Sequence, residues 1–164
     1  DGVARALWVA PVGNAAPQGA AMTAEQWAWG EVRSGIATVT QAIFEALVPQ
    51  MLNYESVGGV NFKKGCYPGQ EVVARSQFRG TLKRRAYLAH APVALRAGDE
   101  LFASDDPGQP CGVVAQAAAA PAGGFDAIVA MQVSAFEAGV VHALSPDGPL
   151  LSLSPAPYPL LADI

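Results

Sequence analysis

The chain has 164 residues, of which 51% are hydrophobic and 15% are charged, and its formal net charge is −4. This length suits one domain, or one small domain with part of another, and the hydrophobic fraction argues against a disordered chain. Residues 112–133 are the most apolar stretch, but polar residues, Gly and Pro interrupt them, whereas a membrane-spanning helix needs about 20 nearly continuous apolar residues. We therefore expect no membrane partner. The chain starts at Asp1 without a basic region and an apolar run, so we expect no signal peptide and a cytoplasmic protein.

The first elements along the chain are a short strand and a helix. The apolar run Ala4–Val9 predicts a strand, and a loop rich in Pro, Gly and Asn follows it. A helix is expected over Ala24–Ser34, with Trp27 and Val32 packing inward. Its boundaries rest on a capping-box pattern and a terminal glycine, at Thr23, Gln26 and Gly35.

The next segment gives weaker signals. Gln41–Leu52 is apolar enough for a helix, but Pro49 would stop a helix there, so its structure stays open. Gly58 and Gly59 predict a turn, and Val60–Phe62 is expected to be extended.

A tight loop and a second helix are predicted next, and they carry the chemistry. Gly65 and Gly69 bracket the loop, which contains Cys66, and the helix Gln70–Phe78 should end at Gly80. The free amides at the start of this helix would point toward the loop, and lysines lie on its other side, so the thiolate form of Cys66 should be favoured. Cys66 is then a plausible nucleophile, redox group or transient metal ligand, although many free cysteines are simply small buried hydrophobes.

Basic residues concentrate around this loop. Seven of the ten lie between Lys63 and Arg85, where Glu71 is the only acid, so this segment carries a net charge of +6 and the remainder −10. The basic segment predicts a site for a phosphate, a polyglutamate tail or nucleic acid, although a solvated surface gives the same pattern. Arg75 and Arg79 are four residues apart on one helix face and could clamp a carboxylate or phosphate.

The second half of the chain contains short strand signals separated by turn residues. This spacing favours a small antiparallel barrel or sandwich and an α+β fold overall, with a domain boundary near residues 80–85. The expected strands are Arg85–Ala89, Glu100–Ala103, Val113–Ala117, Ala127–Val133 and Leu150–Leu153. The expected turns are Ala97–Asp99, Asp106–Gly108 and Pro146–Gly148.

The other potential ligand residues give no functional pattern. Cys111 follows an acidic turn that would disfavour a thiolate, and it is interpreted as structural. No CxxC motif is present and His90 and His142 are far apart in the sequence, so no metal site is predicted.

The residues from Lys64 to Glu71 read Lys-Gly-Cys-Tyr-Pro-Gly-Gln-Glu, and this string resembles the signature of the YgfZ family, which is related to the glycine-cleavage T-protein. The resemblance extends over residues 32–85 and includes a Pro-Gln-x-x-Asn segment at 49–53. It identifies the chain as the C-terminal part of such a protein. Residues 1–82 would then belong to an aminomethyltransferase-like folate-binding region and residues 83–164 to a small antiparallel β-barrel.

The resemblance implies a function. Family members bind tetrahydrofolate and support the assembly or repair of iron–sulfur proteins, through which they affect tRNA modification. Cys66 corresponds to the family cysteine and would be the reactive thiol. The expected partners are folate and iron–sulfur proteins or their assembly factors, with tRNA involved only indirectly. The residues expected to bind the cofactor are Lys64, Tyr67, Gln70, Glu71, Arg75, Arg79, Gln50 and Asn53.

Two alternatives remain at this stage. The chain could be an aminomethyltransferase of the T-protein type, which shares the fold and folate, although the cysteine-containing signature is not the usual T-protein loop. It could also be a tRNA-binding module that uses the basic segment 63–85, but this segment has few interleaved aromatic residues and resembles no RNA-reading module.

Overall fold

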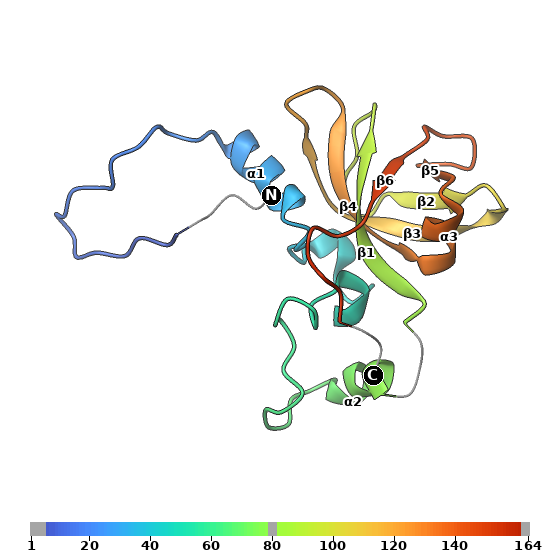
Figure 1. The fold of residues 1–164 in the computed structure, drawn as a ribbon, viewed down its shortest axis with the longest axis horizontal. Helices are drawn as coiled ribbons and strands as arrows, with labels where there is room; N and C mark the ends of the chain where they lie inside the picture. The colour runs from blue at the N-terminus through green and yellow to red at the C-terminus, as the bar shows by residue number, and fades with distance from the viewer. Residues whose placement is uncertain (1–5, 79–81, 162–164) are drawn as a thin grey trace.

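A computed structural model describes residues 6–78 and 82–161 of the chain. An antiparallel sheet forms the main body, helix α1 lies beside it, and helix α2 lies away from the sheet at the lower end of the molecule (Figure 1). The helices are α1 (Ala24–Arg33), α2 (Gln70–Phe78) and α3 (Val133–Ala138), with the 3₁₀ helices η1 (Gln41–Ile43) and η2 (Pro49–Leu52). The strands are β1 (Arg84–Ala91), β2 (Glu100–Ala103), β3 (Asp106–Ala119), β4 (Phe125–Gln132), β5 (Val141–Ala143) and β6 (Ser152–Ser154).

The six described strands form one sheet in the order β5-β2-β3-β4-β1-β6, and each pairs antiparallel with its neighbours. The residues just before β6 also reach the opposite edge strand, because the Leu151 amide donates to Val141 of β5 over 2.9 Å. The segment 149–154 therefore contacts both edges of a strongly curved, half-barrel sheet. This arrangement confirms the α+β class and is compatible with the small β-barrel predicted for this half.

The sheet buries both of its faces. Tyr87 and Ala89 of β1 point to one side, where α3 covers the core and the Phe136 ring stacks on Tyr87 at 3.8 Å. Ala86 and Leu88 point to the other side and pack with Val32, Ile43 and Leu52 from α1, η1 and η2. Elements on both sides of the predicted boundary at residues 82–83 thus share this second core. Burial on both faces explains the apolar run Ala86–Ala89 in the middle of β1, which is flanked by Arg84, Arg85 and His90.

The first helix matches its sequence signals. Thr23 accepts a hydrogen bond from the Gln26 amide at 3.2 Å, and the Gln26 side chain accepts one from the Thr23 amide at 2.9 Å, which confirms the capping box. Gly35 follows the helix with a φ of +70°, and a β-carbon there would lie 2.6 Å from Pro157 Cδ. Only glycine both adopts this positive φ without strain and leaves room for Pro157. Gly35 therefore ends α1 and also lets the C-terminal segment pack against the end of this helix.

Several expectations for the first half were wrong. Residues 6–9 of the predicted strand Ala4–Val9 are irregular and largely exposed, because no described strand pairs with them; Ala4 itself lies outside the described residues. Trp27 is 51% exposed, because Ala28, Trp29 and Val32 form the stripe that faces the sheet. The segment Gln41–Leu52, whose structure the sequence left open, contains two short 3₁₀ helices, and Pro49 begins the second of them.

The extended piece expected at Val60–Phe62 is irregular, and Phe62 opens a turn. The turn at Gly58–Gly59 is confirmed, as is helix α2 with the predicted boundaries, whereas Gly80 lies outside the described residues.

The strand predictions for the second half were confirmed at their centres and wrong in some boundaries. The turn expected at Asp106–Gly108 is instead at Ser104–Asp105, because Asp106 already pairs with Ala103. Val133 begins α3 and does not end a strand. Both α3 and β5 lacked a sequence signal strong enough to predict them. Within the described part of the chain, no helix combines the length and the apolar character that a bilayer span requires.

Candidate functional site

The signature loop lies at the start of α2, in the lower part of the molecule and away from the sheet (Figure 1). Gly69 has a φ of +79° and turns the chain into the helix. The Gln70 side chain accepts a hydrogen bond from the Tyr67 amide at 3.2 Å, which holds the loop against the first turn. Cys66 is exposed in this loop, and helix α2 begins four residues later, at Gln70. The sulfur is therefore accessible to solvent and is not sealed in a core.

Two signature residues close to Cys66 in the sequence, Lys64 and Tyr67, form part of the wall of a small pocket. The Lys64 ammonium lies 4.5 Å from the centre of the Tyr67 ring, a cation–π contact. Both residues line a cavity of about 150 Å³, whose wall combines apolar, aromatic, amide and cationic groups. The other lining residues are Pro49, Tyr54, Gly59, Val60, Asn61 and Val73.

One lining residue, Tyr54, has a partly buried hydroxyl, and burial raises its pKa. This hydroxyl donates a hydrogen bond to the carbonyl of Ala37 at 2.5 Å and so stays protonated.

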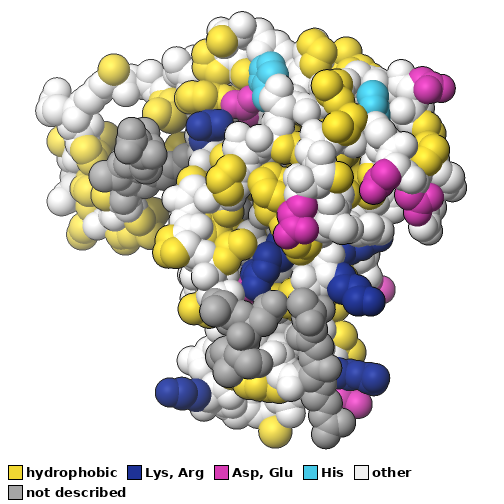
Figure 2. Space-filling view, turned by 45° about the vertical axis from the view of Figure 1, so that its right-hand side comes forward, with side chains coloured by type: hydrophobic (Ala, Val, Ile, Leu, Met, Phe, Trp, Pro, Cys, Tyr) yellow, Lys and Arg dark blue, Asp and Glu magenta, His cyan; other side chains and the backbone are white. Residues whose placement is uncertain are grey.

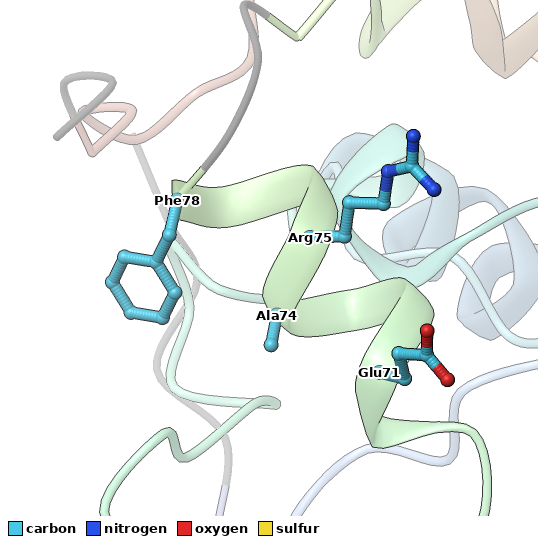
Figure 3. A pocket seen from close by; sticks show the side chains of 4 residues that line it. All are labelled: Glu71, Ala74, Arg75 and Phe78. Atoms are coloured by element: carbon cyan, nitrogen blue, oxygen red, sulfur yellow. The ribbon is translucent and has the colours of Figure 1, made fainter.

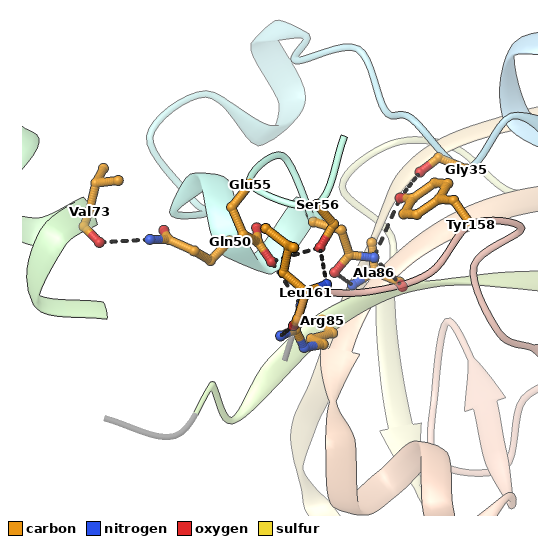
Figure 4. Close-up of polar contacts among 10 residues, drawn as sticks. Gly35, Gln50, Glu55, Ser56, Val73, Arg85, Ala86, Tyr158 and Leu161 are labelled. Atoms are coloured by element: carbon orange, nitrogen blue, oxygen red, sulfur yellow. Dashed lines mark hydrogen bonds and ion pairs between the residues drawn. The ribbon is translucent and has the colours of Figure 1, made fainter. Parts of the chain in front are cut away.

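Gln50, predicted as a cofactor ligand, is fully buried and attaches α2 to η2. Its Nε2 donates to the carbonyl of Val73 at 2.6 Å, while its Oε1 has no hydrogen-bond partner among the described groups (Figure 4). Its amide therefore positions the helix that carries the signature. A direct contact of Gln50 with a cofactor stays a prediction.

Asn53 is also fully buried and bonds to the backbone of β1. It adopts a left-handed conformation with a φ of +58°, donates to the carbonyl of Ala86 at 2.8 Å and accepts from the Ala86 amide at 3.3 Å. Its Nδ2 also lies 3.5 Å from the Tyr158 hydroxyl. The side-chain amide of Asn53 is therefore hydrogen-bonded by groups of the protein itself. Cofactor binding by Asn53 stays a prediction.

Glu71 and Arg75 are exposed on α2 and project in the same direction (Figure 3). With Ala74 and Phe78 they line an open cavity of about 490 Å³. The structure thus places Arg75 where a bound anion could reach it. Arg79, its expected partner in an anion clamp, lies outside the described residues.

The basic segment is less concentrated on the surface than its sequence indicates. Arg85 is buried, and its guanidinium contacts the Glu55 carboxylate at 2.9 Å and the carbonyl of Leu161 at 3.1 Å (Figure 4). Lys63, Lys64 and Arg75 remain exposed near the loop. Lys83 is also exposed and Arg84, the first residue of β1, is half-buried, so among the described basic residues of this segment burial removes Arg85 from the anion-attracting surface.

Glu55, Ser56 and Tyr158 complete the support beneath the loop, and sequence reasoning missed them. The Tyr158 hydroxyl donates to the carbonyl of Gly35 at 2.8 Å, and the Leu161 amide donates to Ser56 Oγ at 3.0 Å. The segment 41–62 has only two charged residues, Glu45 and Glu55, and this scarcity of charge was the one signal available for Glu55. Its partner Arg85 could not be paired with it without the fold.

The second cysteine has a different environment. Cys111 is 3% exposed within the sheet, and burial raises the pKa of its thiol. In the described ranges, no three His, Cys, Asp or Glu side chains lie in an arrangement that could hold a metal ion.

No known family model matches this sequence.

Proposed function

We propose that this chain is the C-terminal part of a tetrahydrofolate-binding accessory protein of the YgfZ type, with an aminomethyltransferase-like region before the sheet. In this proposal the loop 63–70 and the start of α2 bind part of the folate, and Cys66 acts as a reactive thiol in the assembly or repair of iron–sulfur proteins. Effects on tRNA modification would follow indirectly through those proteins.

One observation carries the proposal: Cys66 is exposed, and two residues of its own loop, Lys64 and Tyr67, line a cavity. An aromatic ring with an ammonium group nearby suits a cofactor that combines a flat heterocycle with carboxylates. Arg75, one helical turn away from Glu71 on α2, lines a different, open cavity and supplies a second cation on the helix that follows the loop.

The described residues fit part of such a cofactor. The small cavity has room for one portion of the molecule, and the exposed cations favour its negatively charged end. Tetrahydrofolate, when bound, would supply one-carbon carrier chemistry. Tyr67 would orient its ring system, Lys64 and Arg75 would hold its carboxylates, and Gln50 would keep α2 in place through Val73.

Isothermal titration of tetrahydrofolate into the protein tests the binding. Tyr67→Ala and Arg75→Ala should each weaken binding by about tenfold, as expected for losing one good contact of 1–2 kcal/mol. Arg96→Ala removes an exposed arginine outside the loop and should leave the affinity unchanged. Absence of binding heat, or equal losses in all three variants, would contradict the proposal.

The thiol role has a separate test in cells. Cys66→Ala should fold and bind folate normally but fail to complement a deletion strain in an iron–sulfur enzyme assay, because only the sulfur is removed. Full complementation by this variant would remove Cys66 from the mechanism while leaving folate binding intact.

A further inference from the structure

Helix α2 has an outward side that no described residue covers. Only Val73 and Gln77 of this helix are buried, and they point toward η2. Phe78 is 56% and Val72 is 54% exposed, and Phe62, 37% exposed, contacts the Phe78 ring edge-on at 5.5 Å. Large apolar side chains grouped in this way are typical of interaction sites.

The same side carries positive charge. Lys63 follows Phe62 and is exposed, and the exposed Arg75 lines the same cavity as Phe78. Glu71 also lines this cavity and is the single acid between residues 56 and 98. Figure 2 shows the Lys and Arg side chains mainly in the lower half of the molecule, and most of the Asp and Glu side chains over the sheet. We call Phe62, Lys63, Val72, Arg75 and Phe78 the α2 surface.

From this combination we infer that the α2 surface docks an acidic, amphipathic helix of a partner protein. Charge complementarity selects an acidic partner, and the exposed rings select one with apolar anchors. The open cavity of about 490 Å³ between Arg75 and Phe78 has a size that accepts such an anchor. Phe78, at the edge of this cavity, would be the main aromatic contact.

A second copy of this chain is a poorer occupant. The α2 surface is positive and the exposed acids of the same chain, such as Asp105, Asp106 and Glu137, lie on the sheet and α3. Their attraction would join the α2 surface of one copy to the sheet of the next. Such head-to-tail contacts produce open filaments unless the rotation happens to close a ring.

The size of the surface predicts the strength of binding. A helix of nine residues with its preceding loop presents less than the roughly 800 Å² per partner of a standard interface. The contact should therefore be transient, with an affinity near the micromolar range, about −8 kcal/mol. The α2 surface shares Arg75 with the folate proposal, but Phe62, Val72 and Phe78 are not among the proposed folate contacts, so Phe78→Ala tests docking separately from folate binding.

The test uses fluorescence anisotropy with a labelled peptide of about 14 residues, roughly four helical turns, built from Glu and Leu at amphipathic spacing. The matched peptide has Gln in place of every Glu. We expect the acidic peptide to bind and the Gln peptide to bind at least about tenfold more weakly. Phe78→Ala and Arg75→Glu should each weaken the acidic peptide by about tenfold or more, and Val140→Ala, another exposed apolar residue far from α2, should change nothing.

Four results would overturn the inference. The first is equal binding of both peptides, and the second is unchanged binding by both Phe78→Ala and Arg75→Glu. The third is self-association in sedimentation that Arg75→Glu abolishes. The fourth is binding of a single-stranded RNA in place of the peptide. Because Arg75→Glu changes an exposed side chain, it keeps the test informative if Phe78→Ala loosens α2, and tetrahydrofolate titration of Phe78→Ala separates this site from the folate proposal.

Discussion

The indole N–H of Trp29 donates to Oδ2 of Asp126 at 2.8 Å, and this bond ties α1 to β4. The other carboxylate oxygen of Asp126 lies 2.8 Å from Nδ1 of His90 on β1, so one side chain links a helix and two strands. Arg33 approaches the same carboxylate at 4.0 Å. Because the Asp126 side chain is only 13% exposed, water can replace these contacts poorly.

Trp29→Phe should lower the free energy of unfolding by about 1.5–3 kcal/mol, because it keeps most of the ring but removes a hydrogen bond to a charged group. Urea denaturation followed by circular dichroism measures this loss. Trp8→Phe is the matched control, since Trp8 lies in the irregular N-terminal segment and should change stability by less than about 0.5 kcal/mol. Equal effects of the two variants would contradict the importance of the Asp126 contact.

Asn53→Ala should destabilise the protein by about 3 kcal/mol or more. It leaves the amide and carbonyl of Ala86 unpaired in the interior and places alanine in a left-handed conformation. Asn53→Gly loses the same hydrogen bonds without the backbone penalty, so it should be about 1 kcal/mol less destabilising than Asn53→Ala. Thermal and urea unfolding compare the two variants with Asn14→Ala, an exposed control. Identical losses for Gly and Ala would show that the backbone conformation contributes nothing.

The two cysteines should differ in reactivity. Cys66 is exposed, whereas Cys111 is buried in the sheet, where burial raises the pKa of its thiol. Titration of the native protein with a thiol reagent should therefore detect Cys66 alone, and denaturant should reveal the second thiol. Cys66→Ser should abolish the native signal and Cys111→Ser should leave it unchanged. Rapid native labelling of Cys111 would contradict the burial of its side chain.

Stability should fall at alkaline pH. Burial raises the pKa of the hydroxyls of Tyr54, Tyr87 and Tyr158 above the ordinary value of 10.0. The folded state therefore holds these protons at pH values where the unfolded state has lost them, so their contribution is fully present below pH 10 and is lost as the pH rises above it. Unfolding free energies measured across this range should decline, and the decline should be shallower in Tyr158→Phe. A flat profile above pH 10 would contradict this prediction.

Local sequence signals predicted much of the fold. Thr23 and Gln26 placed the start of α1, and Gly69 with the pattern after it gave α2 its boundaries, because caps and glycine turns depend on residues a few positions apart. β5 was missed because three residues carry too little periodicity, and its partners in the sheet come from β2 and the segment before β6.

The candidate site was predictable only in part. The helix that begins after the glycine-bracketed loop agrees with the sequence expectation. The sequence left open whether Cys66 is reactive or simply buried, and the structure shows it exposed. The positions of Gln50 and Asn53 could be named, but not that both side chains are buried and bonded to the backbone of α2 and β1. Their roles as cofactor ligands were expected from a sequence motif. A motif does not show which side chains form hydrogen bonds inside the protein instead of binding a ligand.

The sequence by itself determined helices α1 and α2, the centres of most strands in the second half, and where charge and thiol groups concentrate, because these properties follow from neighbouring residues. Only the tertiary structure decided which side chains face solvent. It removed Arg85 from the basic surface by pairing it with Glu55, turned Trp29 instead of Trp27 toward the sheet, and left one side of α2 uncovered. Burial depends on contacts between residues that are distant in the chain, and those contacts form only when the whole core packs.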